Sequence, residues 1–256
     1  MQLKNNTPLA LYCLRLADDS LIAGHMVSQW CGHGPVLEQD IALINMSLDL
    51  LGQARNLYQY CAELNGGLPF TEDTFAYHRD EREFYNHLLV ELPNGDFAHT
   101  IARQLFLATY QYYLYQALSQ STNLQLAAIA QKSVKETAYH LRYTSEWAIR
   151  LGDGTNESHT RMQQAIDAIW PYTGELFTPN KIDQALYQQN ITPNLEAIAT
   201  LWQQHITSVF NEATLIQPSI KTWMQKGGID GVHTEYLGPL LAEMQYLQRA
   251  HPGANW

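Results

Sequence analysis

LQLAAIAQKSVKETAYHLRYTSEWAIRL, residues 124–151, is the stretch that decides the fold class. Apolar residues recur in it at spacings of three and four, which is the period of a helix that packs along one side. Four other stretches share this spacing: Leu9–Trp30, Ile41–Leu64, Phe75–Leu92 and Phe97–Leu118. No comparable run alternates with the period of two that a half-buried strand requires. We therefore expect an all-α protein in which Leu124–Leu151 is the fifth of five amphipathic helices.

Glycine and proline residues fall where these helices should end. They are Gly32, Gly34 and Pro35 after the first helix, Gly66, Gly67 and Pro69 after the second, Pro93 and Gly95 after the third, and Gly152 and Gly154 after the fifth. Asp96 is placed to cap the fourth helix. Three further helical patterns follow, at Met162–Tyr172, Leu195–Leu215 and Tyr236–Arg249. Long helices with short connections indicate an antiparallel bundle, and we predict a single domain over residues 1–256.

The composition narrows the class of protein. The net charge of −10 disfavours a nucleic-acid binder, because such proteins need basic side chains to neutralise phosphates. Cys13, Cys31 and Cys61 lack metal-binding spacing, and their apolar helical surroundings predict free core thiols in a reducing compartment. No stretch has the pattern of a signal peptide or the roughly 20 apolar residues of a membrane span, so we expect a soluble cytoplasmic protein.

An acidic helical bundle raises one catalytic possibility, the di-iron site of ferritin-like proteins. That site takes a Glu from each of two helices and a Glu-x-x-His from each of two others, because positions i and i+3 point the same way. The chain contains no Glu-x-x-His. Asp-x-x-His occurs at Asp96/His99 and Asp230/His233, but the first Asp suits a helix cap and the second pair begins in a glycine-rich loop. We therefore predict no metal site and no catalytic residue in this chain.

Two Glu/His pairs have a spacing of four instead of three. Glu136 and His140, in the fragment KETAYH, are either two remaining ligands of such a site or an ordinary helix carboxylate and a hydrogen-bonded core histidine. We favour the second interpretation. Glu83 and His87 are expected to form an exposed pair on the third helix.

Asp18 and Asp19 are adjacent carboxylates on the first helix. Neighbours on a helix diverge by about 100°, so the two cannot serve one acid–base site. We expect at least one of them to be solvated.

The fourth helix is crowded with aromatic residues. Phe106, Tyr110 and Tyr113 share one face, while Tyr112 and Tyr115 lean to the other side. A buried tyrosine needs a polar partner for its hydroxyl, and a contact between subunits supplies such partners. The helix is therefore either central, with intramolecular neighbours on two sides, or part of a contact with another protein chain.

Four fragments of the chain are long and unusual strings: WCGHGPVLEQDIALINMSLDLLGQARNLYQY at 30–60, RDEREFYNHLLVELPNGDFAHTIARQ at 79–104, KETAYHLRYTSEW at 135–147 and GVHTEYLGPLLAEMQYLQRAHPGANW at 231–256. They resemble the non-catalytic ferritin-like subunit of the phenylacetyl-CoA epoxidase family, and the resemblance covers nearly the whole chain. It implies a ferritin-like antiparallel helical bundle with additional C-terminal helices.

The resemblance also implies where metal ligands have been lost. The di-iron catalytic subunit of that family has a helix motif Asp-Glu-x-Gly-His, which is similar to the fragment DLLGQ beginning at Asp49. Leu50 then stands at the ligand Glu and Gln53 at the ligand His. A second motif, Lys-Glu-Glu-x-Phe-His, is similar to KETAYH, so that Thr137 falls on the ligand Glu and only His140 remains. These four positions are the expected vestigial di-iron site, because iron needs anionic carboxylates and Leu50 has no lone pair.

The implied function is that of a structural, non-catalytic subunit in a complex that epoxidises the ring of phenylacetyl-CoA in aerobic phenylacetate degradation. Its expected partners are the di-iron catalytic subunit of the same complex, the other epoxidase subunits and a reductase that passes electrons from NADPH through flavin and an iron–sulfur cluster. The chain itself is expected to hold no cofactor, and to self-associate when it is alone. Two alternatives stay open: an independent oxidase with an unusual metal site that uses Glu136 and His140, and a helical acyl-CoA-binding protein.

Overall fold

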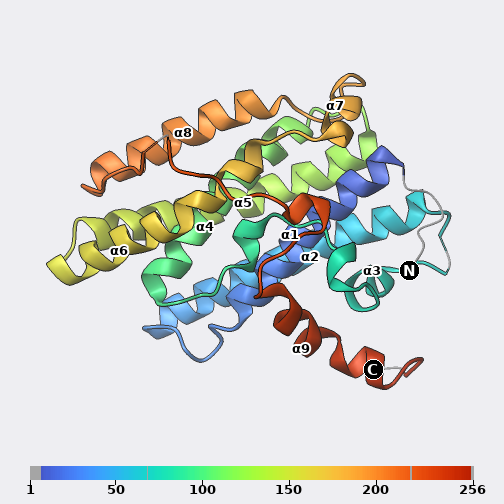
Figure 1. The fold of residues 1–256 in the computed structure, drawn as a ribbon, viewed down its shortest axis with the longest axis horizontal. Helices are drawn as coiled ribbons and strands as arrows, with labels where there is room; N and C mark the ends of the chain where they lie inside the picture. The colour runs from blue at the N-terminus through green and yellow to red at the C-terminus, as the bar shows by residue number, and fades with distance from the viewer. Residues whose placement is uncertain (1–6, 68, 220, 255–256) are drawn as a thin grey trace.

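The computed structural model describes residues 7–67, 69–219 and 221–254. Over these ranges the secondary structure consists of nine α-helices and five short 3-10 turns, with no strand. The predicted all-α class is confirmed, and the arrangement is that of a ferritin-like bundle with further helices after it. Figure 1 shows the long helices crossing the body of the molecule, with the C-terminal helix projecting from one side.

Four long helices form the bundle: α1 (Pro8–Ser28), α2 (Leu37–Leu64), α4 (Phe97–Leu118) and α5 (Leu124–Gly152). α1 packs along α2, α4 packs along α5, and α2 also contacts α5. Side-chain caps fix three of the helix starts, since Thr7, Asp96 and Asn123 each accept a hydrogen bond from a backbone N–H of the first turn. The predicted cap at Asp96 is confirmed.

The remaining helices surround this bundle. They are α3 (Glu72–Tyr77), α6 (Asn156–Ile169), α7 (Lys181–Tyr187), α8 (Leu195–Glu212) and α9 (Leu237–Ala250). α6 and α8 cover α4 and α5, whereas α7 lies on α1. α9 contacts only α3 and the following turn closely, and its far end stands away from the body (Figure 1).

The aromatic helix α4 lies inside the molecule. Phe106 is fully buried and packs against the rings of Trp170, Trp202 and Phe210, which α8 and the turn after α6 bring to it. Tyr110 and Tyr115 are also buried. The central position of α4 accounts for Phe106, Tyr110 and Tyr115 through intramolecular neighbours, whereas Tyr112 and Tyr113 are only partly buried.

The prediction of one helix over Phe75–Leu92 is wrong. α3 ends at Tyr77, and only the 3-10 turns η1 (Glu81–Glu83) and η2 (Leu88–Glu91) follow. The backbone N–H groups of Tyr85 and His87 donate to the carboxylates of Asp18 and Asp19 on α1, instead of to carbonyls of their own helix. Side chains distant in sequence thus replace the helical hydrogen bonds of this segment.

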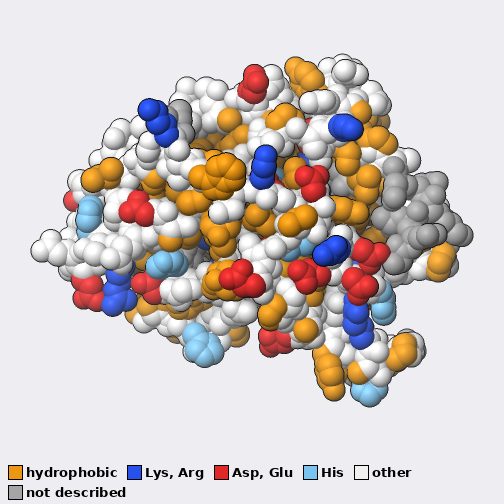
Figure 2. Space-filling view, in the orientation of Figure 1, with side chains coloured by type: hydrophobic (Ala, Val, Ile, Leu, Met, Phe, Trp, Pro, Cys, Tyr) orange, Lys and Arg blue, Asp and Glu red, His pale blue; other side chains and the backbone are white. Residues whose placement is uncertain are grey.

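The position of Cys31 differs from the prediction of three core thiols. Cys13 and Cys61 are buried as expected, but Cys31 is exposed in the loop between α1 and α2, because α1 ends three residues before it. No helix within the described residues has both the length and the apolar character to cross a bilayer. Figure 2 shows one face with separated charged side chains among hydrophobic ones, and acidic and basic groups gathered where Figure 1 places α6.

Candidate functional site

α2 and α5 bring the four expected vestigial positions together in the bundle interior. Leu50 and Gln53 lie one turn apart on α2, and Thr137 and His140 lie one turn apart on α5. All four are at most 1% exposed. The two helices are linked by side-chain hydrogen bonds at this level, so the positions from the two motifs share one site.

The polar side chains of this α2/α5 site bind one another across the helices. Gln53 donates from Nε2 to Glu136 Oε2 at 3.0 Å, and His140 Nε2 lies 3.0 Å from Asp49 Oδ2. The Thr137 hydroxyl donates to the carbonyl of Ser133 in its own helix, at 2.9 Å. Since a carboxylate only accepts, His140 donates to Asp49. His140 is thus a buried hydrogen-bonded histidine, as the favoured interpretation had it.

The most deeply buried side chains of the α2/α5 site, Leu50, Gln53 and Thr137, are uncharged. Tyr115 of α4 is also buried, and burial together with the charges of Asp19 and Glu136 raises the pKa of its hydroxyl, against a lowering effect of a hydrogen bond with Ser20. The phenol therefore stays neutral. Gln53 Oε1 is buried without a hydrogen-bond partner in the described part of the chain. This environment favours neutral groups over the negative charge that a metal-binding carboxylate would bring.

The donor set does not fit a di-iron centre. Such a centre needs several carboxylates and two histidines, whereas Leu50 offers no donor and the Thr137 hydroxyl is engaged by its own helix. Among the described residues, no three His, Cys, Asp or Glu side chains are grouped so that they could hold a metal ion.

A second polar region, the carboxylate cluster, lies between α1 and the segment 79–91. We define it by four buried acidic residues: Asp18, Asp19, Glu91 and Glu175, which are 0–2% exposed. Each accepts a hydrogen bond from a backbone N–H group of a loop or a 3-10 turn. Buried carboxylates are stable only when they are paired or hydrogen-bonded, and these four satisfy that condition.

Asp18 is bound by three residues of this region. It forms an ion pair with the buried guanidinium of Arg79, accepts from the Tyr58 hydroxyl at 2.6 Å and accepts from the Tyr85 N–H at 2.9 Å. Asp19 accepts from the His87 N–H at 2.7 Å. Neither carboxylate is solvated, so the expectation for Asp18 and Asp19 is wrong: the donors come from residues about 40 to 70 positions away.

Two histidines of the cluster are paired with its carboxylates. Burial alone would lower the pKa of His87, but the charge of Asp19 and a hydrogen bond from Nδ1 at 2.7 Å raise it. The prediction of an exposed Glu83/His87 pair is therefore wrong, because His87 turns inward to α1. Burial would also lower the pKa of His233, but the hydrogen bond to Glu91 and the charge of that carboxylate outweigh burial and raise it.

His233 anchors the loop that follows Gly227 and Gly228. Its Nδ1 lies 2.6 Å from Glu91 Oε1 and its Nε2 lies 2.9 Å from the carbonyl oxygen of Phe84, so both nitrogens must carry protons. Gly228 passes so close to the segment 86–88 that a Cβ there would lie 2.2 Å from the Asn86 carbonyl oxygen. The loop is packed into the cluster, and Asp230/His233 has no metal-binding geometry.

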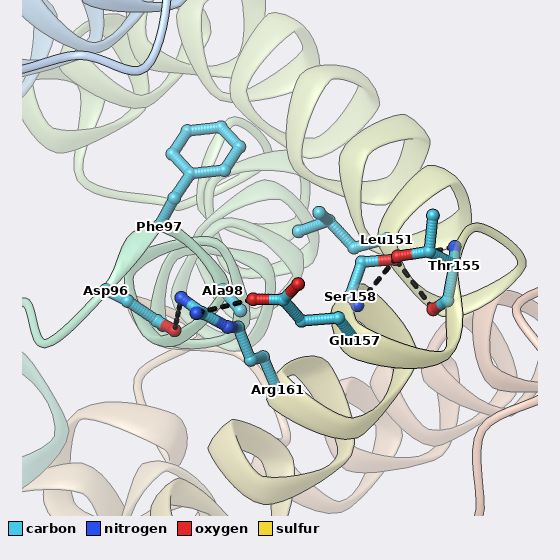
Figure 3. A pocket seen from close by; sticks show the side chains of 8 residues that line it. All are labelled: Asp96, Phe97, Ala98, Leu151, Thr155, Glu157, Ser158 and Arg161. Carbon is cyan, nitrogen blue, oxygen red and sulfur yellow. Dashed lines mark hydrogen bonds and ion pairs between the residues drawn. The ribbon is translucent and has the colours of Figure 1, made fainter.

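A surface pocket of about 240 Å³ lies away from both regions, at the starts of α4 and α6. Arg161 lies between Asp96 and Glu157 and forms an ion pair with each, at 3.5 and 2.7 Å (Figure 3). Asp96 also caps α4 and binds His99 Nδ1 at 2.8 Å. The two carboxylates and the guanidinium are all engaged in ion pairs, so the pocket offers no unpaired charged side chain to a ligand.

Sequence reasoning missed Asp49, Arg79 and Glu175 as parts of these regions. Asp49 stood in the quoted motif, and its spacing to Gln53 on one helix face was a signal for it. Arg79 and Glu175 carried no local signal, because their partners lie 61 and 87 residues away in sequence.

The chain matches known proteins over its full length. Residues 1–256 match the family model described as phenylacetic acid catabolic protein. The chain is 49% identical to the C subunit of 1,2-phenylacetyl-CoA epoxidase from Escherichia coli (strain K12) over 248 residues, which are 97% of this chain and 99% of the relative. The resemblance seen in the sequence fragments is confirmed, and the chain belongs to the phenylacetic acid catabolic protein family.

Proposed function

We propose that this chain is a structural, non-catalytic subunit of a multicomponent 1,2-phenylacetyl-CoA epoxidase, which stabilises and positions the di-iron catalytic subunit in aerobic phenylacetate degradation. The similarity to the C subunit of the Escherichia coli enzyme supports the place of the chain in such an assembly. The redox chemistry then belongs to the other components: iron in the catalytic subunit, and flavin, an iron–sulfur cluster and NADPH in the reductase.

The observation that carries the non-catalytic role is the side-chain set of the α2/α5 site. Leu50 places an aliphatic side chain at one expected ligand position. Gln53 is hydrogen-bonded to Glu136, and His140 is hydrogen-bonded to Asp49. These bonds join the two helices and leave no grouped set of anionic donors. A site of this kind stabilises the bundle and does not support oxygen chemistry.

Metal analysis tests the proposal against an independent oxidase. The purified chain is loaded with ferrous iron under anaerobic conditions and analysed for bound metal. We expect no stoichiometric iron, manganese or zinc. One or two tightly held ions per chain, lost on His140→Ala, would contradict the structural role.

Reconstitution of the complex tests whether turnover by the catalytic subunit depends on this chain. The chain and the catalytic subunit of the same genome are co-expressed, and epoxidation of phenylacetyl-CoA is measured per mole of intact complex. We expect turnover to need the chain, and His140→Ala complexes of normal composition to keep their rate within a few-fold. Failure of the two chains to co-purify would favour a separate acyl-CoA-binding protein.

A further inference from the structure

A cavity of about 270 Å³ lies where α1 meets the loop after η1, the start of α7 and the turn η5 (Gly228–Asp230). It adjoins the carboxylate cluster, because its lining residue Tyr85 donates its N–H to Asp18. Its volume is slightly below the roughly 300–1,000 Å³ of pockets that bury drug-sized ligands. The cavity therefore suits a smaller molecule, on the order of ten non-hydrogen atoms.

Two of the lining residues, Arg15 and Tyr12, are 5% and 2% exposed, and each has a polar group without a partner. Asp183 binds both terminal nitrogens of the Arg15 guanidinium, but the buried Nε has no hydrogen-bond partner in the described part of the chain. The guanidinium lies over the Tyr12 ring at 5.1 Å, and no hydrogen bond joins the Tyr12 hydroxyl to another described residue. Burial raises the pKa of this hydroxyl, so the group stays protonated and can donate. Since buried donors are normally satisfied, this side of the cavity favours an occupant that accepts hydrogen bonds.

The charges at the cavity select an uncharged occupant. The guanidinium of Arg15 is already balanced by its ion pair with Asp183. Asp230, which also lines the cavity, is exposed and forms no ion pair with another described residue, so an anion would meet an unbalanced negative charge. An ammonium ion has no lone pair with which to accept from Arg15 or Tyr12. A neutral oxygen, such as that of a carbonyl group, meets both conditions.

The remaining wall of the cavity is largely apolar. Leu11, Ile182 and Ile229 come from three different elements and line it with hydrocarbon side chains. Tyr85, which is half-buried, adds an aromatic ring. Apolar walls with a few polar groups that fix the orientation are typical of sites for small organic molecules, and a flat ring packs well against them.

We infer that this cavity binds a small uncharged aromatic molecule through a carbonyl oxygen, an aromatic amide being the simplest example. The oxygen accepts from Tyr12 and Arg15, and the ring lies against the apolar wall. Such binding is separate from the proposed structural role, because the cavity shares no residue with the α2/α5 site and needs no second subunit.

Three probes of similar size test the class of ligand: benzamide, which is neutral, benzoate, which is an anion, and benzylamine, which is a cation at neutral pH. The full chain is labelled with carbon-13 in the isoleucine δ1 methyl groups, and Ile182→Val and Ile229→Val assign the two cavity signals. We expect benzamide to shift these two signals with a Kd of about 1 mM, while the signal of Ile216, 74% exposed elsewhere, stays in place. Benzoate and benzylamine should bind about tenfold more weakly or worse.

Two variants test the contacts. Tyr12→Phe removes only the hydroxyl and should weaken benzamide binding about three- to tenfold. It should cause no loss of thermal stability, because that hydroxyl has no partner among the described residues. Leu11→Trp fills the cavity and should abolish the shifts. Tyr246→Phe and Leu124→Trp, at positions that are 66% and 83% exposed elsewhere, are the matched controls, and thermal unfolding shows whether each variant is folded.

The outcomes decide between a site and an unused cavity. Benzamide binding that Tyr12→Phe weakens and Leu11→Trp abolishes supports the site. It is overturned if about 10 mM benzamide shifts neither cavity signal, or if Leu11→Trp and Leu124→Trp respond equally. Tighter binding of benzoate or benzylamine overturns the uncharged class. If Leu11→Trp does not fold, unchanged binding by Tyr12→Phe is enough to reject the contacts.

Discussion

The two buried polar regions of this bundle differ in whether their carboxylates are buried. The carboxylate cluster holds four acidic side chains that are 0–2% exposed, and each binds a backbone N–H or a cation. The α2/α5 site has a leucine and a threonine at the positions where the family resemblance places carboxylate ligands, and its own two carboxylates lie partly exposed at the rim. Buried charge is kept where it holds loops and 3-10 turns in place. The positions that the family resemblance aligns with carboxylate ligands carry no buried charge.

The largest expected effect comes from unbalancing the carboxylate cluster. Arg79→Leu leaves the carboxylate of Asp18 buried without its cation, and breaking a buried pair in this way costs about 3–5 kcal/mol of the free energy of unfolding. Chemical denaturation measures the loss. Arg55→Leu is the control, because its ion pair with Glu72 is exposed and such pairs contribute about 0–1 kcal/mol. Equal losses of unfolding free energy in Arg79→Leu and Arg55→Leu would show that the buried ion pair contributes no more to stability than the exposed one.

A smaller loss is expected in the α2/α5 site. His140→Ala removes a buried ring and its bond to Asp49, but Asp49 is 35% exposed and can turn to water. We expect a loss of about 1–3 kcal/mol. Denaturation of the isolated chain gives the value, and Asp49→Asn serves as its partner variant. A loss above that of Arg79→Leu would reverse the comparison.

Changing pH acts on the cluster more gently than removing a side chain. His87 and His233 have raised pKa values in the folded chain, so the stability they supply is full below the ordinary histidine value of 6.5 and is lost as pH rises through their higher folded values. Unfolding free energy should therefore fall as the pH rises above the ordinary histidine value of 6.5.

Two other histidines, His25 and His205, act in a lower pH range. Burial lowers the pKa values of His25 and His205, so their effect on stability lies below the ordinary value of 6.5. The combined variant His87→Gln with His233→Gln should flatten the decline. Native stability that increases from neutral to alkaline pH would rule out the charged pairing of these two histidines.

The smallest effect is expected for Gln53→Met. The change removes a buried amide oxygen that has no partner in the described residues, and it costs one hydrogen bond to Glu136. These contributions oppose each other, so the unfolding free energy should change by less than about 1 kcal/mol. Gln53→Glu, which buries a charge near Glu136, is the contrasting variant and should be clearly less stable.

The helical spacing of apolar residues predicted most of the helices. It failed where hydrogen bonds to side chains distant in sequence determine the backbone conformation. The stretches at Leu9–Trp30 and Leu124–Leu151 form helices close to the expected bounds. Phe75–Leu92 has the same spacing of apolar residues, yet Asp18 and Asp19 take its N–H groups. A local pattern cannot report a donor–acceptor pair that is 67 or 68 residues apart.

The candidate site was predictable in part. The motif comparison brought forward Leu50, Gln53, Thr137 and His140, and the fold places these four in one buried layer. Their roles as ligands lost from a metal centre stay a prediction. The bonds that now join the helices, to Asp49 and Glu136, depend on the register of α2 against α5, which the sequence alone does not fix.

The pairing of Glu91 with His233 and Thr234 has a consequence for how the chain reaches its native state during synthesis. Glu91 cannot form its hydrogen bonds to His233 and Thr234 until residues more than 140 positions later have been synthesised. Arg15 likewise pairs with Asp183, which lies 168 residues further along the chain. Contacts so distant along the chain slow folding, because a long loop must close before they form. On the ribosome, Asp18 and Asp19 can bind their partners once residue 87 has emerged, but Glu91 lacks His233 and Thr234 until nearly the last residues have been added.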